Sequence, residues 1–164
     1  MPARIHPTDR ASPRHYSFGS TAAIVTSVGL IVGFGAADVP RAAIVSGLMI
    51  IALADNVSDS LSIHIYQESE NLERLAAFRA TLTNFAARFV VTMSFVGITL
   101  VTPLSSAPTV ALVWGALLLG VLTHAVARAR GANPWRETFK HVVVASLVIA
   151  VSRILGAWIA GHVR

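Results

Sequence analysis

The chain has 164 residues, of which 54% are hydrophobic and only 13% are charged, and its mean hydropathy is +0.66. Soluble domains usually carry about 25% charged residues, so this composition excludes an ordinary soluble domain and predicts an integral membrane protein. The net charge of +5 comes mostly from arginine. Because the arginines lie between apolar runs, they indicate membrane topology rather than a nucleic-acid partner. The chain contains no cysteine, which excludes disulfides and thiolate chemistry.

Five apolar runs of membrane length follow a polar leader. Residues 1–18 are basic and have no apolar stripe, so they are predicted to form a flexible cytoplasmic tail. The first apolar run, at about 20–37, is interpreted as a span rather than a signal peptide, because the polar lead is long and four more such runs follow. After a turn at Asp38-Val39-Pro40, the second helix is expected to run from Arg41 to about Tyr66.

The rest of the chain continues this pattern to its end. The predicted elements are a short cytoplasmic amphipathic segment at 67–84, spans at about 85–102 and 109–127, and a last helix from 134 to about 160. Asn133 is predicted to cap the last helix, with Pro134 at its first position. Residues 19–164 are therefore expected to form an all-α domain of five transmembrane helices.

The distribution of basic residues predicts the orientation of these helices. With the N-terminus in the cytoplasm, the outer side holds only Arg41 and Arg164. The inner side then holds Arg4, Arg10, Arg14, Arg74, Arg79, Arg88, Arg128, Arg130, Arg136 and Lys140. Short loops rich in Lys and Arg remain cytoplasmic, so the C-terminus is predicted to be external. The chain is expected in a plasma or inner membrane.

Three ionisable residues are predicted to lie within the bilayer. They are Asp55 and Asp59 in the second helix and Arg153 in the fifth. Each costs at least about 2.5 kcal/mol in hydrocarbon, so each needs a partner or a function. A structural ion pair between Arg153 and Asp55 is one interpretation. The depths of the two residues in the membrane differ by roughly 9 Å, and a long arginine side chain can cover much of that gap. A cation-handling role for Asp59 is the other.

The second helix carries the candidate ion site. Asp55 and Asp59 are four residues apart, so they share a helix face with Ser62, and a second polar stripe runs beside them. The candidate ion-pathway residues are Asp55, Asn56, Asp59, Ser62, His64, Glu68, Glu70 and Glu73. Carboxylate, hydroxyl and amide oxygens suit hard or borderline divalent cations, and an imidazole adds a ligand for iron, cobalt or zinc. The glutamates are alternatively a solvated helix face, and His64 alone is a weak signal.

Small residues in the first span suggest a close helix contact. Gly29 and Gly33 are four residues apart, a spacing that lets another helix approach closely. We expect these glycines to form a contact between two copies of the chain, in a homodimer.

The run Ala54-Asp55-Asn56-Val57-Ser58-Asp59, continuing to Glu70, resembles the second-helix motif of the vacuolar iron transporter family. The resemblance implies five spans with an internal N-terminus, a homodimer, and export of ferrous or manganous ions from the cytosol by proton antiport. Three departures stand beside it. The family's acidic residue early in the first helix is absent, its second-helix methionine is Ile63, and its glutamate-rich cytosolic domain is reduced to residues 67–84.

The function expected from the sequence is a proton-coupled exporter of divalent metal cations of the Fe²⁺/Mn²⁺ class. No serine–histidine–acid, HExxH or phosphate-cradling motif is present, so an enzyme is not expected, nor is a resident cofactor. The alternative is a non-transporting membrane interaction protein that keeps the transporter fold. The expected partners are the lipid bilayer, a divalent metal ion and a second copy of the chain.

Overall fold

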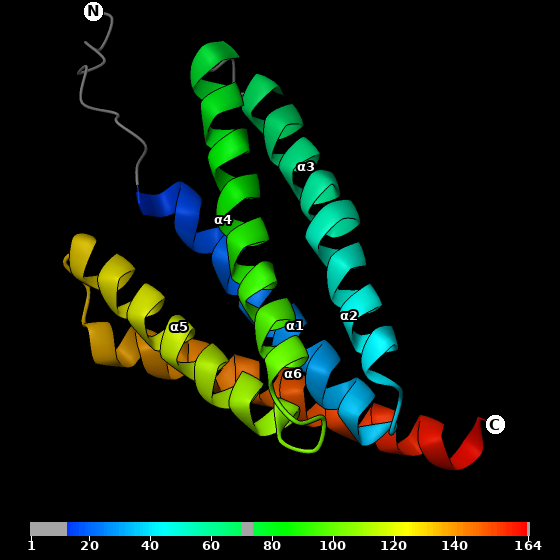
Figure 1. The fold of residues 1–164 in the computed structure, drawn as a ribbon. Helices are drawn as coiled ribbons and strands as arrows, with labels where there is room; N and C mark the ends of the chain where they lie inside the picture. Colours follow the sequence, from blue (N-terminus) through cyan, green and yellow to red (C-terminus); the bar gives the residue numbers. More distant parts are fainter. Residues whose placement is uncertain (1–12, 70–73, 164) are drawn as a thin grey trace, which may run out of the picture.

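The computed structural model describes residues 13–69 and 74–163, and within them every regular element is a helix (Figure 1). The elements are α1 (Pro13–Ala36), α2 (Arg41–Ile50), η1 (Ile51–Asp55), α3 (Asn56–Ser69), α4 (Arg74–Val101), α5 (Ala107–Ala129) and α6 (Pro134–His162). The π-helical turn η1 joins α2 to α3 without a break, so these three elements form one long helix. The predicted all-helical fold is confirmed.

Five helical stretches in the described part of the chain are long and apolar enough to cross a membrane. They are Gly19–Ala36, Arg41–Tyr66, Phe78–Val101, Ala107–Ala129 and Pro134–His162. Each has at least 18 residues, against the roughly 20 helical residues that span a hydrocarbon core. The second stretch has the predicted bounds, and Asn133 caps α6 as predicted, because its side chain accepts from the backbone N–H groups of Trp135 and Arg136.

Two boundaries differ from the predicted ones. α1 begins at Pro13, inside the predicted tail of residues 1–18, and proline suits a first helical turn because its missing N–H is not needed there. α4 begins at Arg74, so residues 74–84 are the first turns of the third membrane helix and not a separate amphipathic segment. No glycine or proline occurs in the first half of α4, so nothing in that sequence ends a helix.

α1 lies at the centre of the bundle, in contact with α2, α4, α5 and α6 (Figure 1). More than half of its span is buried inside the protein, whereas most of α6 is exposed. Ile24, Val28 and Ile31 of α1 share one hydrophobic cluster with Phe95 of α4 and Leu119 of α5. A helix that is apolar on all sides is expected at such a buried position.

Small residues permit the close crossing of α1 and α6. Gly33 of α1 faces Ser152 and Gly156 of α6, and a Cβ at Gly156 would collide with the backbone carbonyl of Gly33. A Cβ at Gly29 would lie 3.1 Å from the Ser152 hydroxyl oxygen. Both glycines of α1 are therefore buried by a helix of their own chain, and their predicted role as a dimer contact is wrong. The spacing of small residues signals a close helix approach, but it does not say which helix approaches.

The beginning of α2 is fastened to the end of α4. The Arg41 guanidinium donates hydrogen bonds to the backbone carbonyls of Leu100 (2.5 Å) and Thr102 (2.9 Å). Carbonyls at a helix C-terminus lack partners within the helix, and the helix dipole favours a cation there. This contact sets α2 antiparallel to α4, so that η1 and α3 pack along the earlier turns of α4.

Candidate functional site: a buried arginine beside two aspartates

Arg88 is a charged side chain buried in the third membrane-length stretch. Only 2% of it is exposed, and at 1.5 Å per residue it lies about 15 Å along α4 from Phe78, where that stretch begins. A charged group in hydrocarbon costs at least about 2.5 kcal/mol, so the position requires partners.

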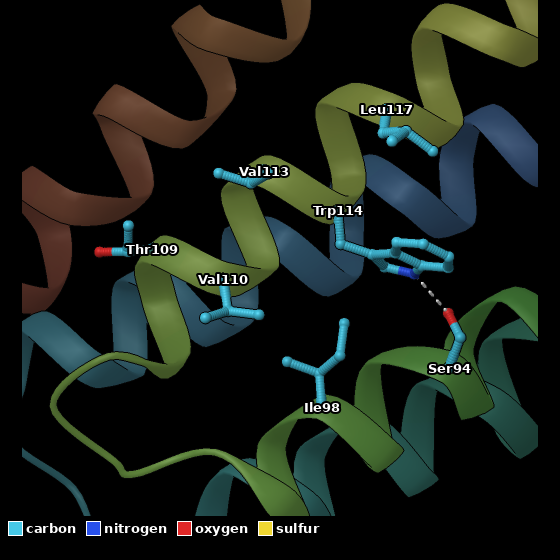
Figure 2. Close-up of a pocket in the computed structure, with 7 residues that line it drawn as sticks. All are labelled: Ser94, Ile98, Thr109, Val110, Val113, Trp114 and Leu117. Atoms are coloured by element: carbon cyan, nitrogen blue, oxygen red, sulfur yellow. Dashed lines mark hydrogen bonds between the residues drawn. The ribbon is translucent and has the colours of Figure 1, made fainter.

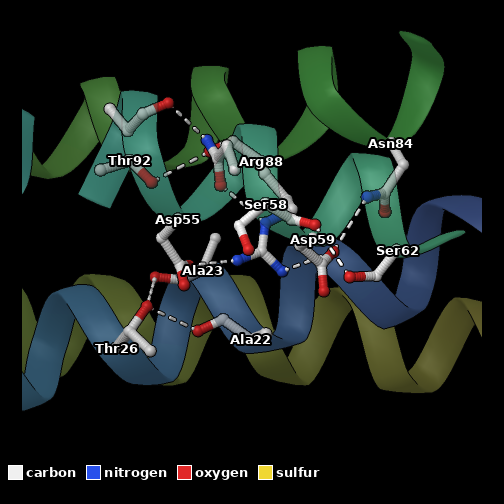
Figure 3. A network of polar contacts seen from close by, with 12 residues as sticks. Ala22, Ala23, Thr26, Asp55, Ser58, Asp59, Ser62, Asn84, Arg88 and Thr92 are labelled. Carbon is white, nitrogen blue, oxygen red and sulfur yellow. Dashed lines mark hydrogen bonds and ion pairs between the residues drawn. The ribbon is translucent and has the colours of Figure 1, made fainter. Parts of the chain in front are cut away.

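Three acceptors surround the Arg88 guanidinium, all within the last residue of η1 and the first turn of α3, and Figure 3 shows the two aspartates among them. Nη2 donates to Asp55 Oδ2 at 2.5 Å, and Nη1 donates to Asp59 Oδ2 at 3.1 Å. Nε donates to Asn56 Oδ1 at 2.6 Å. Hydrogen bonds between ionised groups are roughly twice as strong as neutral ones, so this arginine fastens the long second helix to α4 at one place.

Asn84 and Gly19 complete the surroundings of the arginine. Asn84 is buried one turn before Arg88, and its Nδ2 donates to Asp59 Oδ2 at 3.2 Å. A Cβ at Gly19 of α1 would collide with Asn84 Oδ1 and would lie 2.9 Å from Arg88 Cγ and Cδ, so only glycine lets α1 cover this side. We call the following five residues the Arg88 network: Asp55, Asn56, Asp59, Asn84 and Arg88.

The two carboxylates remain partly accessible. The side chain of Asp55 is 49% exposed and that of Asp59 is 27% exposed, against 3% for Arg88. Within residues 13–69 and 74–163, Oδ1 of each aspartate accepts no hydrogen bond. With both carboxylates ionised, two negative charges face one guanidinium. The network then carries a net charge of about −1 and has acceptor oxygens to spare.

The structure brings Asp55, Asn56 and Asp59 together, but it does not add the other predicted site residues to them. Ser62 is exposed and donates to the Ser58 carbonyl, and His64 lies further along α3. Glu68 belongs to α3, but its side chain lies outside the described structure, as do Glu70 and Glu73 entirely. In the described part of the chain, no three side chains among His, Cys, Asp and Glu are grouped to hold one metal ion.

The ion pair predicted between Asp55 and Arg153 is not the one that the structure forms. Asp55 pairs with Arg88, while Arg153 lies exposed on α6. α6 packs mainly on α1 and α5, whereas η1 and α3 pack on α4. Matching the depth of two residues in the membrane was therefore not sufficient, because the two helices have to be neighbours as well.

Arg88 and Asn84 are the network residues that the sequence prediction missed. The predicted third span, at about 85–102, has Arg88 near its inner end, and the charge distribution counts it as a cytoplasmic charge. The available signal was a stripe at helical spacing on α4 that consists of Asn84, Arg88, Thr92 and Thr99, all of them buried. A polar stripe on one membrane helix predicts a facing polar stripe on another.

A groove of about 300 Å³ lies between α3 and α4, next to the network. It is lined by Val57, Ser60, Leu61, His64, Phe78, Thr81, Leu82 and Phe85. The buried Ser60 hydroxyl accepts and donates no hydrogen bond among the described residues. The groove is otherwise mostly apolar and offers no carboxylate to a cation.

A second groove of about 450 Å³ lies between α4 and α5 (Figure 2). Its lining residues are Ser94, Ile98, Thr109, Val110, Val113, Trp114 and Leu117. Trp114 Nε1 donates to Ser94 Oγ at 3.0 Å, which uses one of the few polar groups of this wall. Apart from Thr109, the remaining lining is apolar, and it has no charge with which to bind an ion, so the Arg88 network is the candidate functional site.

Comparison of the chain with protein-family models, curated proteins and solved structures finds no match. The resemblance to the vacuolar iron transporters therefore rests on the second-helix residues alone, three of which the structure gathers around Arg88.

Proposed function

We propose that this protein is a multi-pass membrane transporter that exports divalent metal cations of the Fe²⁺/Mn²⁺ class in exchange for protons, with Asp55 and Asp59 as the exchanging carboxylates. The observation that carries the proposal is the unbalanced charge of the Arg88 network: two partly exposed carboxylates face one buried guanidinium. A net negative charge at membrane depth attracts a cation or a proton, since either one neutralises it.

Arg88 acts in this proposal as a fixed internal cation. Its side chain packs against Asn84 and Gly19, so it stays in place while the exposed oxygens of the two carboxylates exchange their ligands. It lowers the charge that a bound ion has to balance, and so lets protons compete with the metal. The guanidinium thus makes release of the metal ion possible. Two carboxylates with no neighbouring cation would retain a divalent ion.

The structure changes the expected division of labour between the aspartates. Asp59 was expected to handle the ion and Asp55 to be occupied by an arginine. Asp55 is in fact the more exposed of the two and has one partner, whereas Asp59 Oδ2 accepts from both Arg88 and Asn84. We therefore assign ion exchange to both carboxylates, with Asp55 as the more accessible of the two.

The direction of transport rests on the orientation of the chain. Arg88 lies within a span and no longer counts as a cytoplasmic charge, but the other nine inner basic residues still face only Arg41 and Arg164 outside. This excess supports a cytoplasmic N-terminus by the positive-inside rule. Asp59 and α3 then lie toward the cytoplasmic side, where export begins.

The test is metal uptake into proteoliposomes with Fe²⁺, Mn²⁺, Zn²⁺ and Co²⁺, using the full chain. Asp55→Asn and Asp59→Asn each bring the network to zero net charge, so each is expected to abolish uptake. Asp38→Asn is the matched control, because Asp38 is an exposed carboxylate in the α1–α2 turn, far along the chain from the network. Its positive φ of 54° is tolerated by asparagine as well as by aspartate. Transport by wild type and D38N that is lost in D55N and D59N supports the proposal.

A second candidate function is a non-transporting membrane interaction protein. It is favoured by one observation: Arg88 contacts both aspartates and Asn56, so the network is also a fastening between α3 and α4. This second function replaces the transporter proposal if the wild type moves none of the four metals. It also replaces it if D55N and D59N transport normally.

A further inference from the structure

The π-turn η1 leaves one backbone carbonyl without its usual α-helical partner. In an α-helix, the N–H of residue 56 donates to the carbonyl of residue 52. Here the Asn56 N–H donates instead to the carbonyls of Ile51 and Leu53. The Ala52 carbonyl accepts from the side chain of Asn56, whose Nδ2 lies 2.9 Å away. Asn56 is fully buried, so this bond is shielded from water.

The same asparagine side chain also accepts from Arg88. Its Oδ1 is 2.6 Å from Arg88 Nε, so a chain of hydrogen bonds leads from the guanidinium through Asn56 to the π-turn. Asp55, the last residue of η1, is bonded to the same guanidinium. The charged network and the irregular turn of the second helix therefore share their atoms.

A π-turn holds one residue more than an α-turn, and it is rare in proteins and frequently found at functional sites. Its conversion to an α-turn advances the helix beyond it by one residue, which is a rotation of about 100°. α2 is fixed to α4 by Arg41, so the segment that turns is α3. Such a rotation carries Asp59 away from Arg88 and Asn84.

We propose that Asn56 is a positioning residue that couples the charge of the Arg88 network to the π-turn. Asp55 and Asp59 orient the Arg88 guanidinium, Arg88 Nε holds Asn56, and Asn56 satisfies the Ala52 carbonyl, so the π-turn persists. When the ion pairs to Asp55 and Asp59 are lost, the guanidinium turns within its place, Asn56 is released, and α3 rotates as the turn becomes α-helical. The inference rests on the proposed function for its role in transport, where the rotation exposes the carboxylates alternately, but the coupling is testable without transport.

The test measures the position of α3 relative to α4 with spin labels. The chain has no cysteine, so labelled cysteines at Leu61 and Leu82 are unique; both side chains are more than half exposed and line the same α3–α4 groove. A rotation of about 100° moves a side chain about 5 Å from the helix axis by roughly 8 Å. The control is a labelled pair at Ala42 of α2, which precedes the π-turn, and Val101 at the end of α4. The distance between these two labels is expected to stay unchanged.

Two backgrounds change the coupling from opposite ends. D55N/D59N removes both ion pairs, and Asn56→Ala removes the link itself. Each is expected to add a population in which the Leu61 label is displaced by roughly 8 Å, so that the Leu61–Leu82 distance differs from that of the wild type. An unchanged distance in D55N/D59N overturns the inference even if Asn56→Ala fails to fold. A shift in only one of two folded variants also overturns it, because the coupling requires both.

Metal uptake in the same preparations separates this inference from the proposed function. A displaced α3 in D55N/D59N, together with a wild type that moves no metal, supports the coupling and refutes transport. Metal uptake by the wild type with no displacement in D55N/D59N supports transport and refutes the coupling.

Discussion

Replacing Arg88 with leucine tests whether the Arg88 network holds the second helix against α4. The substitution removes the donor to Asp55, Asn56 and Asp59 at once. It also leaves two carboxylates on one helix face with no cation between them. The variant should therefore lose stability by more than the removal of an apolar contact would explain.

The expected loss follows from how far each contact is buried. Asn56 is fully buried, so removal of the donor to its Oδ1 costs about 1–3 kcal/mol. The Asp55 pair is half-exposed and screened by solvent, so its share is about 0.5–1 kcal/mol. The Asp59 pair lies between these limits, at about 1–2 kcal/mol. Arg88→Leu should therefore cost about 2.5–6 kcal/mol, a range that contains the roughly 3–5 kcal/mol expected when one partner of a buried ion pair is removed.

The assay is unfolding by SDS titration in mixed micelles, followed by the fluorescence of the three tryptophans. Arg153→Leu is the matched control, because Arg153 is an exposed arginine in an equally apolar helix and should cost less than about 0.5 kcal/mol. The triple variant R88L/D55N/D59N should recover much of the loss, since no charge is then left unpaired. The reasoning is refuted if R88L costs no more than R153L, or if the triple variant is as unstable as R88L.

Three further predictions concern the bundle around the site. Gly156→Ala should lower stability, because its Cβ meets the Gly33 carbonyl, whereas Gly97→Ala meets nothing within 4 Å and should be neutral or slightly stabilising; thermal aggregation in detergent compares the two. Arg41→Leu should cost about 1–2 kcal/mol in the SDS titration, because it strands two carbonyls at the end of α4; Arg41→Lys should restore part of that. A reporter fused after Arg164 should be found on the external side of the membrane, and a cytoplasmic reporter would contradict five spans with an internal N-terminus.

Much of the fold could be predicted from the sequence, because membrane helices depend on local information. Hydrocarbon requires about 20 apolar residues for each span, which predicts five spans, and the turn at Asp38-Val39-Pro40 predicts that the second of them starts at Arg41. The Asn133 cap likewise depends only on residues next to it in the chain. The start of α4 was less predictable. Residues 74–84 are partly polar, and a prediction that relies on apolar runs leaves such residues out of the span.

The partners of the site residues could not be predicted in the same way. Two aspartates in a membrane helix require a cation, and the sequence-based prediction names only Arg153, because it counts Arg88 as a cytoplasmic charge. The choice depends on which helices are neighbours, and that is decided by glycine contacts such as Gly19 against Asn84 and Gly33 against Gly156. These contacts are between residues far apart in the chain. The need for a partner is thus a local property, whereas its identity is set by the packing of the whole bundle.

The fixed guanidinium leads to a last prediction, on how many chains a divalent ion needs. One Arg88 network has a net charge of about −1, so a single M²⁺ would leave it positive, and Arg88 cannot withdraw without displacing α1 from Asn84. Two networks brought together in a symmetric dimer balance one M²⁺, and one proton on each restores neutrality when the metal leaves.

Wild-type and Asp59→Asn chains mixed in equal amounts before reconstitution test this requirement. Only dimers with two wild-type chains would transport, and random pairing makes these about a quarter of the total. Uptake should therefore fall to about one quarter of the wild-type rate if both networks are needed, but only to about one half if each chain works alone. D38N mixed with wild type should leave the rate unchanged, which controls for the mixing itself. A value near one half would refute the shared site, and the single chain would then have to neutralise a divalent ion with charges beyond Asp55 and Asp59.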